Sequence, residues 1–251
     1  MELIKNKKVG KVLLIVEGGK HEFSLMKKIF VDVLGYTQIE QRRGNTKYYM
    51  RPGERHSVIA VINTKTSNIS SINEEDYLER IFGELLINYD FDIDDAAIYY
   101  LFDRDPESNV NPDLIKSLIA MLTNSRDNEN YMRGGMLILS YPSIEAYEIS
   151  NFLDNSSKIE KKLGSEVKAY INENAKIISM NKINENSIIH GVTELITYLK
   201  ELGMGMDLDK FSSVNKEVFN DEEQYLETNN RFKLLSMFSF VLADLGILRE
   251  A

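Results

Sequence analysis

Three short runs of apolar residues constrain this fold more than any other feature of the chain. They are KVLLIV at 11–16, AAIYYLF at 96–102 and GGMLILSYP at 134–142. Each run lacks the polar alternation of a half-exposed strand, so both faces of each strand should be covered. Segments with helical spacing lie at 19–34, 74–89 and 111–124. Strands that alternate with helices pair in parallel through right-handed crossovers. The sequence therefore predicts an α/β fold with a mostly parallel sheet flanked by helices.

The chain changes character after Pro142. Residues 143–251 show only helical patterns, which predicts an α/β domain over 1–150 followed by an α-helical domain over 151–251. Within the second domain, residues 232–248 are apolar on more than one face. This segment is either a buried core helix or an interface with a partner or a second copy of the chain, and a core helix is the simpler interpretation.

The composition excludes several classes of protein. Of the 251 residues, 43% are hydrophobic, which is enough for a substantial core. The absence of cysteine excludes disulfide frameworks, zinc ribbons and thiol nucleophiles, and it is compatible with a reducing compartment. VLLIV near the N-terminus is shorter than the roughly 7–15 apolar residues of a secretory signal peptide. LLSMFSFVLADLGIL near the C-terminus is interrupted by Asp244 and falls short of the roughly 20 residues of a membrane span. We expect a cytoplasmic protein without a membrane segment.

Acidic residues follow the apolar strands at their carboxyl ends. The first strand ends at Glu17, the second ends at Asp103 and Asp105, and the third leads through Pro142 to Glu145 at a helix start. Ligands of open parallel sheets bind in the crevice outside this edge. While the chain stays extended, Asp103 and Asp105 should point to one face. Carboxylates at such spacing repel each other unless a cation lies between them or one takes up a proton.

The residue types at this edge favour one class of cofactor. Oxygen ligands without histidine or cysteine suit Mg²⁺ or Mn²⁺ better than zinc. Gly18 and Gly19 would let the backbone turn sharply and let a phosphate approach closely. Each motif alone is more often a simple turn or cap. An apolar strand, E-G-x-x-x-E, a helix and a second apolar strand ending in D-x-D form a far more specific combination.

These motifs also resemble a known family. VEGGKHEF and LFDRD are similar to the two signatures of the Toprim domain, which topoisomerases, primases, ribosomal-RNA maturases and OLD-type nucleases share. LSYPSIEAYEI resembles a narrower group, the stand-alone Toprim nucleases of bacterial antiphage defence (RloB-like and PARIS AriB-like). The resemblance covers about residues 10–155. It implies a Toprim fold and metal-dependent hydrolysis of phosphodiester bonds in RNA or DNA by an endonuclease. It also permits an ATPase partner, which would have to supply any ATP dependence because the chain lacks a Walker A motif.

The resemblance further implies roles for individual residues. Glu17 would be a metal ligand or general acid/base, and Asp103 and Asp105 would be metal ligands in the same catalytic set. Glu22 and Glu145 would be supporting carboxylates around a second cation. Structural alternatives stay open for both, because Glu22 would favour the positive end of a helix in any case and Glu145 fits a helix-start pattern.

A basic segment stands out against the net charge of −9. Residues 41–56 carry a net charge of +4, which leaves −13 for the rest of the chain. Tyr48 and Tyr49 interleave with these charges, as in a strand that contacts a nucleic-acid backbone and its bases. The alternative is a solvated hairpin with snorkelling arginines. The candidate nucleic-acid contacts are Lys20, Arg42, Arg43, Lys47, Arg51 and Arg55.

Two classes of function are compatible with these patterns. The first is a Mg²⁺-dependent endonuclease. The second is a non-catalytic metal-binding subunit of a larger complex, with an ATPase partner or as a homodimer, and the acidic net charge and long helical tail favour it. The histidines do not cluster in the sequence. His21 lies beside the acids, and we expect structural roles for His56 and His190.

Overall fold

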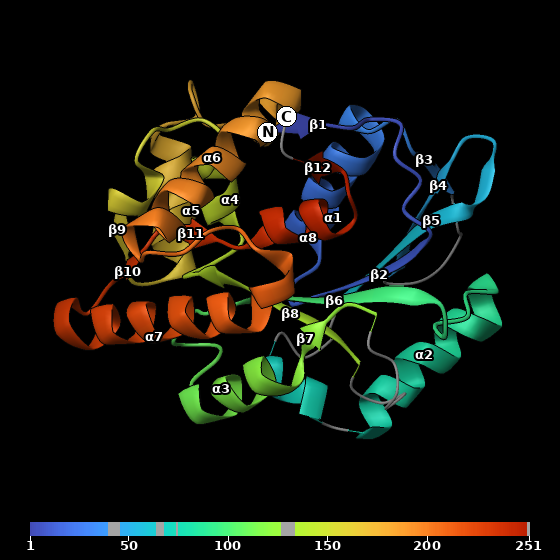
Figure 1. Ribbon diagram of the computed structural model, residues 1–251, viewed down its shortest axis with the longest axis horizontal. Coiled ribbons are helices and arrows are strands. Elements are labelled where there is room, and N and C mark those ends of the chain that lie inside the picture. The colour runs from blue at the N-terminus through green and yellow to red at the C-terminus, as the bar shows by residue number, and fades with distance from the viewer. Residues whose placement is uncertain (40–45, 64–67, 74, 127–133, 250–251) are drawn as a thin grey trace.

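A single twisted sheet forms the centre of the computed structural model, which describes residues 1–39, 46–63, 68–73, 75–126 and 134–249 (Figure 1). Its strands lie in the order β11-β8-β6-β2-β5-β4-β3, and the short β7 pairs with β8 outside this path. The described strands are β1 Glu2–Leu3, β2 Lys11–Val16, β3 Thr37–Ile39, β4 Thr46–Arg51, β5 Glu54–Asn63, β6 Ala96–Asp103, β7 Thr123–Asn124, β8 Gly135–Tyr141, β9 Glu160–Lys161, β10 Phe232–Lys233, β11 Leu235–Ser236 and β12 Leu248–Arg249.

The four inner strands are parallel, as predicted. β2 pairs in parallel with both β5 and β6, and β6 pairs in parallel with β8. The outer strands β4, β3 and β11 run antiparallel to their neighbours. In this register Val16 lies opposite Asn63 on one side and Leu101 on the other. The carboxyl ends of the inner strands therefore meet at one edge of the sheet.

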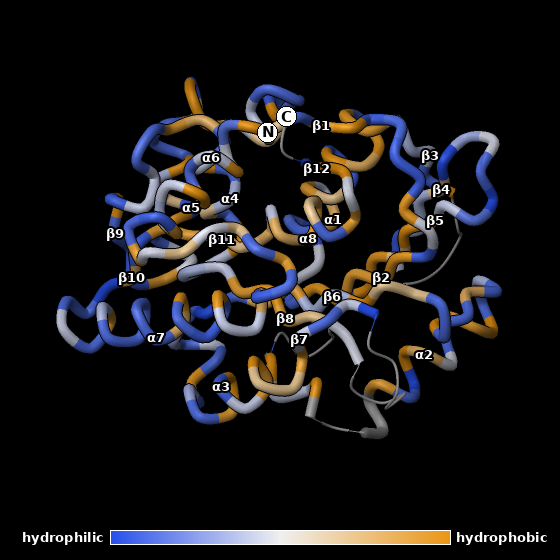
Figure 2. Tube along the Cα trace, in the orientation of Figure 1, coloured by the Kyte–Doolittle hydropathy of each residue, from blue (hydrophilic) through white to orange (hydrophobic). Residues whose placement is uncertain are grey.

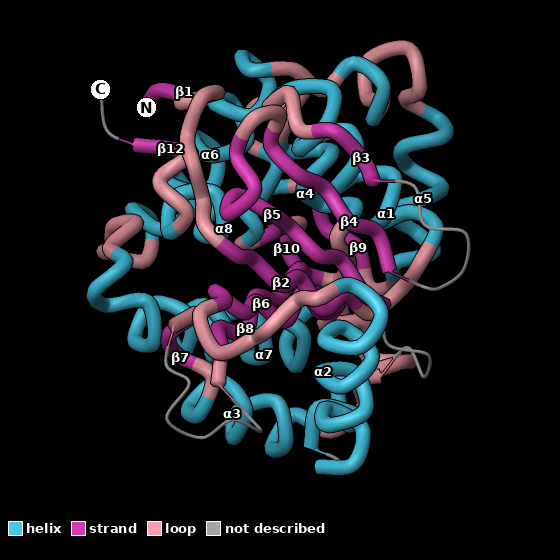
Figure 3. The backbone as a smooth tube through the Cα atoms, turned by 90° about the vertical axis from the view of Figure 1, so that its right-hand side faces the viewer, coloured by secondary structure: helices cyan, strands magenta, loops and turns pink. Residues whose placement is uncertain are grey.

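Helices cover both faces of the sheet. Helices α2, α3 and α7 lie on one face, and α1, α4, α6 and α8 lie on the other, as the two perpendicular views show (Figures 1 and 3). The described helices are α1 Lys20–Lys27, α2 Glu75–Tyr89, α3 Pro112–Met121, α4 Glu145–Ser150, α5 Gly164–Glu173, α6 Glu185–Glu201, α7 Phe211–Asn229 and α8 Phe238–Asp244. After α1 the chain continues through a π-helical segment to Gly35, whose φ of +75° ends the helix as glycine allows. The predicted α/β fold with a flanked, mostly parallel sheet is confirmed.

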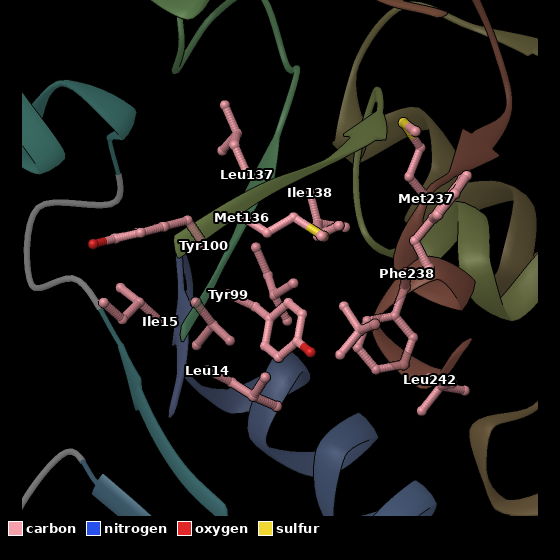
Figure 4. Packing of buried hydrophobic residues seen from close by; sticks show 14 of the residues in the cluster. Leu14, Ile15, Tyr99, Tyr100, Met136, Leu137, Ile138, Met237, Phe238 and Leu242 are labelled. Carbon is pink, nitrogen blue, oxygen red and sulfur yellow. The ribbon is translucent and has the colours of Figure 1, made fainter. Parts of the chain in front are cut away.

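The core lies between the sheet and these helices. Apolar residues concentrate on β2 and β6, while α7 is largely hydrophilic (Figure 2). Side chains alternate along the strands, so Leu14 and Tyr99 point toward Phe238 and Leu242 of α8, and Ile15 and Tyr100 point to the opposite side (Figure 4). Tyr99 and Phe238 are fully buried. Because each inner strand packs on both faces, its sequence is apolar throughout.

The part of the chain after residue 150 contains short strands that its helical patterns did not predict. β11 adds to the central sheet beside β8, β12 pairs with β1, and β10 pairs with β9. The segment at 232–248 is buried core, but it folds as β10, β11, α8 and β12 instead of one helix. Strands of two residues are too short to show a periodicity, so only their tertiary pairing defines them. The main hydrophobic cluster includes residues from both sides of position 150.

None of the described helices is long and apolar enough to cross a lipid bilayer.

Candidate functional site

Glu17 directly follows β2 at the carboxyl edge of the sheet. Its carboxylate Oε2 accepts hydrogen bonds from the Asp103 backbone N–H at 2.9 Å and from Asn109 Nδ2 at 3.0 Å. The side chain is only 7% exposed. Burial raises the pKa of Glu17 to about 7, although these hydrogen bonds lower it and the charge of Glu22 adds to the rise. Glu17 is therefore a carboxyl group that changes protonation near neutral pH.

Asp103 is the last residue of β6, the strand beside β2. Its Oδ1 accepts a hydrogen bond of 2.8 Å from the Ile144 N–H, just before α4. Loss of water around the carboxylate raises the pKa of Asp103 well above its ordinary value, and the negative charges of Glu17, Glu145 and Glu22 raise it further. The four carboxylates of Glu17, Glu22, Asp103 and Glu145 thus interact electrostatically, and we call them the acidic edge.

Glu145 at the start of α4 lies beside a lysine and a histidine. Its Oε1 lies 3.3 Å from Lys168 Nζ of α5 and 3.7 Å from His21 Nε2. The residue is 1% exposed, and its Oε2 has no hydrogen-bond partner among the described residues. A buried carboxylate oxygen without a partner is costly, so this atom is suited to a ligand.

His21 interacts with a second carboxylate, Glu148. The distance between His21 Nε2 and Glu148 Oε1 is 2.6 Å. Burial lowers the pKa of His21, but the hydrogen bond to Glu148 and the charges of Glu145, Glu148 and Glu22 outweigh it, so the pKa is raised. Glu148 was missed in the sequence, although its spacing of three from Glu145 places both side chains on one helical face. Lys168 lies far along the chain, and no sequence pattern connects it with the acids.

Gly18 makes room for the carboxylate of Glu22. A Cβ atom at Gly18 would lie 2.7 Å from Glu22 Cδ, well inside van der Waals contact. Gly19 then forms the N-cap position of α1, and Asn63 at the end of β5 lies beside it. The Gly-Gly turn therefore lets Glu22 fold back toward the end of β2 from the first turn of the helix.

The carboxylate of Asp105 contacts backbone groups in this structure. Its Oδ2 accepts a hydrogen bond of 2.7 Å from the Gly164 N–H, and its Oδ1 accepts one of 2.9 Å from the Glu107 N–H. We expected Asp105 to share a face with Asp103 in an extended chain. However, β6 ends at Asp103, and Asp105 begins a turn in which the Asn109 N–H donates to the Asp105 carbonyl. Asp105 here joins the loop after β6 to the start of α5.

Among the predicted basic contacts, Arg51 is engaged within the fold. Arg42 and Arg43 lie outside the described residues. Arg51 donates hydrogen bonds to the Lys5 and Leu34 carbonyls and to Asn6 Oδ1, at 2.8, 3.3 and 2.8 Å. Its guanidinium also lies 5.4 Å from the centre of the Tyr36 ring. Arg51 therefore holds the N-terminal segment against the hairpin of β4 and β5.

Two of the other described basic residues are more accessible than Arg51. Lys20 and Arg55 are exposed, and the Lys47 ammonium lies 5.5 Å from the centre of the Phe23 ring. Lys20 is the first residue of α1, directly after the Gly-Gly turn at the acidic edge. Of the described candidates, it is the one whose sequence position adjoins the acids.

A second group of metal-type ligands lies elsewhere. Ligand atoms of Asp154, His190 and Glu194 all lie within 4.8 Å of one another, and among the described residues this is the one group of three that does so. His190 Nε2 lies 2.9 Å from Asp154 Oδ1, and Nδ1 lies 2.7 Å from the Ser150 carbonyl oxygen. Glu194 accepts hydrogen bonds from the Ser156 N–H and hydroxyl. These contacts fit a half-exposed ion pair that closes the end of α4, in keeping with the structural role expected for His190.

Comparison of the chain with protein-family models, with curated proteins and with solved structures gave no match.

Proposed function

We propose that this protein is a metal-dependent nuclease that hydrolyses phosphodiester bonds of RNA or DNA. The observation that supports this proposal is the acidic edge itself. Glu17, Glu22, Asp103 and Glu145 come from three separate segments and interact at the carboxyl ends of parallel strands, which is where open α/β sheets bind ligands. Packing several carboxylates together is unfavourable unless a cation lies between them or one takes up a proton, and carboxylates with raised pKa values are frequent at functional sites.

The donor set of the acidic edge fits Mg²⁺ or Mn²⁺. Its candidate ligands are carboxylate oxygens, which hard divalent cations prefer. One oxygen of Glu145 is buried without a hydrogen-bond partner among the described residues. No three of these four described carboxylates have oxygen atoms that all lie within 4.8 Å of one another. Binding a cation through three of them would therefore require side-chain rotation toward it.

The residues of the site would have different roles in hydrolysis. A bound Mg²⁺ would lower the pKa of an attacking water and stabilise the charge of the leaving oxygen. Asn109 and the Asp103 N–H orient the Glu17 carboxylate through their hydrogen bonds. Lys168 carries positive charge beside Glu145, and His21 does so when protonated; both would then attract an anionic phosphate. Lys20, Lys47 and Arg55 would contribute longer-range attraction.

The sequence resemblance gives this proposal its biological setting. The E-G-G-K-H-E and D-R-D motifs supply Glu17, Glu22 and Asp103, in keeping with a Toprim domain. The S-x-P-x-x-E motif after β8 supplies Glu145, in keeping with endonuclease effectors of antiphage defence and an ATPase partner. We therefore place the protein in this group as part of the proposal.

A cleavage assay with matched variants tests the proposal. Wild-type protein should cut single-stranded RNA or DNA with Mg²⁺ or Mn²⁺ and should lose this activity in EDTA. Glu17→Gln and Asp103→Asn should each reduce cleavage at least about 100-fold, because they remove charge from the acidic edge. Asp113→Asn changes an exposed aspartate in the first turn of α3 and serves as the control. Cleavage that survives both site variants would refute the proposal.

The alternative is a non-catalytic metal-binding subunit of a larger complex. The hydrogen bonds from Arg51 to the Lys5 and Leu34 carbonyls favour this alternative. Arg51 was predicted to contact nucleic acid, but here its guanidinium binds backbone groups of the protein itself. In this case the protein would bind Mn²⁺ through the same acids but cut no nucleic acid, alone or with an ATPase. Light scattering after size-exclusion chromatography, combined with the cleavage assay, distinguishes the two functions.

A further inference from the structure

Arg104 lies between the two aspartates of the D-R-D motif and is almost fully buried. It is 3% exposed. Its Nε and Nη2 donate to the two carboxylate oxygens of Glu223 in α7, both at 2.7 Å. The guanidinium also lies 5.6 Å from the centre of the Phe232 ring. Two parallel charge-assisted hydrogen bonds fix the guanidinium in one orientation, and losing either partner would leave a buried charge uncompensated.

Arg104 also holds Asn109 in place through a hydrogen bond. Its third nitrogen, Nη1, donates a hydrogen bond of 3.0 Å to the Asn109 carbonyl oxygen. The Asn109 side chain is buried, and its Oδ1 accepts a hydrogen bond of 2.8 Å from the Ile69 N–H. This bond identifies the other end of the amide as the donor, Nδ2. Both the backbone and the side chain of Asn109 are therefore held in place.

Asn109 in turn holds the acidic edge. Its Nδ2 donates to Glu17 Oε2 at 3.0 Å and to the Asp103 carbonyl oxygen at 2.6 Å. A continuous series of polar contacts thus runs from Glu223 through Arg104 and Asn109 to Glu17. Groups that orient metal ligands in this way usually change metal affinity when they are removed.

We propose that helix α7 positions the carboxylate of Glu17 for metal binding through Glu223, Arg104 and Asn109. These are positioning residues, since none of the three is a ligand in the proposed site. The proposal rests on the proposed function, because it assumes that the acidic edge binds a divalent cation. It gives α7 a role at the metal site, although α7 supplies no metal ligand.

Mn²⁺ binding to the full-length protein, measured by isothermal titration calorimetry, tests this proposal. Glu223→Gln keeps the size of the side chain but removes its charge, and we expect Mn²⁺ affinity to fall by about 10- to 100-fold. The matched control is Asp221→Asn, which breaks the 2.7 Å ion pair between Lys233 and the same helix without touching Arg104. Its affinity should stay within about twofold of wild type. Equal affinity of wild type and Glu223→Gln would overturn the proposal.

Hydrogen exchange provides a second test that does not depend on Glu223→Gln folding well. It also distinguishes failure of the positioning role from failure of the proposed metal site. Arg104→Lys keeps the charge but loses the two-pronged contact. In metal-free protein, hydrogen exchange of the Asp103 amide, which donates to Glu17, should accelerate at least about tenfold in Arg104→Lys but not in Asp221→Asn. Unchanged exchange would refute the positioning role. If wild-type protein binds no Mn²⁺ but Arg104→Lys still accelerates this exchange, the metal site is refuted. The contacts from Glu223 to Glu17 would then have a structural role alone.

Discussion

At the scale of single residues, Glu17 makes the protein sensitive to pH. The pKa rises from an ordinary value of 4.5 to about 7 in the folded protein. Between these values the native state binds more protons than the unfolded state, so the free energy of unfolding decreases as pH rises. In metal-free protein, the contribution of Glu17 to this decrease in the free energy of unfolding should be on the order of 3 kcal/mol. It should be complete above about pH 7.

Urea unfolding between pH 4.5 and 8 measures this effect. Glu17→Gln should make the decrease smaller, because Asp103 and Glu222, whose pKa values are also raised, contribute the remainder, whereas Asp113→Asn should leave it unchanged. Mn²⁺ competes with protons for the same carboxylates, so its stabilising effect should grow over the same pH range. A Glu17→Gln profile that parallels wild type would show that another group titrates.

Gly18 provides a second prediction at this scale. In Gly18→Ala the new methyl group would collide with the carboxylate of Glu22, a flexible group that can move away. Stability should therefore change by less than about 1 kcal/mol, while Mn²⁺ affinity should fall about tenfold because Glu22 is displaced. Calorimetry on Gly18→Ala, Glu22→Ala and the double variant checks this. The double variant should bind no more weakly than Glu22→Ala, and additive losses would contradict the explanation.

At the scale of elements, Arg51 joins the N-terminal segment to the β4–β5 hairpin. Arg51→Met removes three hydrogen bonds and a cation–π contact, so stability should fall by about 2 kcal/mol. Nucleic-acid binding in a fluorescence anisotropy assay should change little. Arg55→Met changes an exposed position of the same hairpin. Its stability should stay within about 0.5 kcal/mol of wild type, but its binding to nucleic acid should be weaker. If only Arg51→Met lost most of its nucleic-acid binding, Arg51 would be a nucleic-acid contact after all.

Asp105 joins two elements in a similar way. Asp105→Ala leaves the Gly164 and Glu107 N–H groups without their acceptor and should destabilise the protein by about 2 kcal/mol. Denaturant unfolding measures this loss, and Glu107→Ala, at an exposed position of the same turn, is the control. Asp105→Asn should recover part of the loss, because an amide oxygen still accepts one hydrogen bond. If Asp105→Ala instead abolishes Mn²⁺ binding at unchanged stability, Asp105 is a ligand.

At the scale of the whole molecule, the C-terminal region completes the fold. β11 extends the central sheet, and α8 packs Phe238 and Leu242 against it. A fragment of residues 1–155 would expose this core surface and should therefore lack cooperative unfolding and dispersed amide NMR signals. A fragment with a native-like spectrum would show that the α/β part folds independently.

Much of the fold could be predicted because the determining signals are local. The boundaries of β2 and the start of β6 match the apolar runs exactly, and α2 begins one residue after the predicted helix start. Glu17 and Asp103 were also predictable, since topology brings the carboxyl ends of parallel strands together. The short C-terminal strands could not be found in this way, because two residues carry no periodicity.

The sequence by itself determined the layered α/β architecture and the acids at the ends of its strands, because hydrophobic periodicity and strand polarity act over a few residues. Only the tertiary structure decided which polar groups surround those acids. Lys168 contacts Glu145 from a distant segment, and Glu223 is linked to Glu17 only through Arg104 and Asn109. Such contacts depend on how helices pack across the sheet, and packing brings together residues whose distance along the chain carries no signal. For the same reason Asp105 turns toward α5, since its position depends on a loop and on a helix that begins far later in the chain.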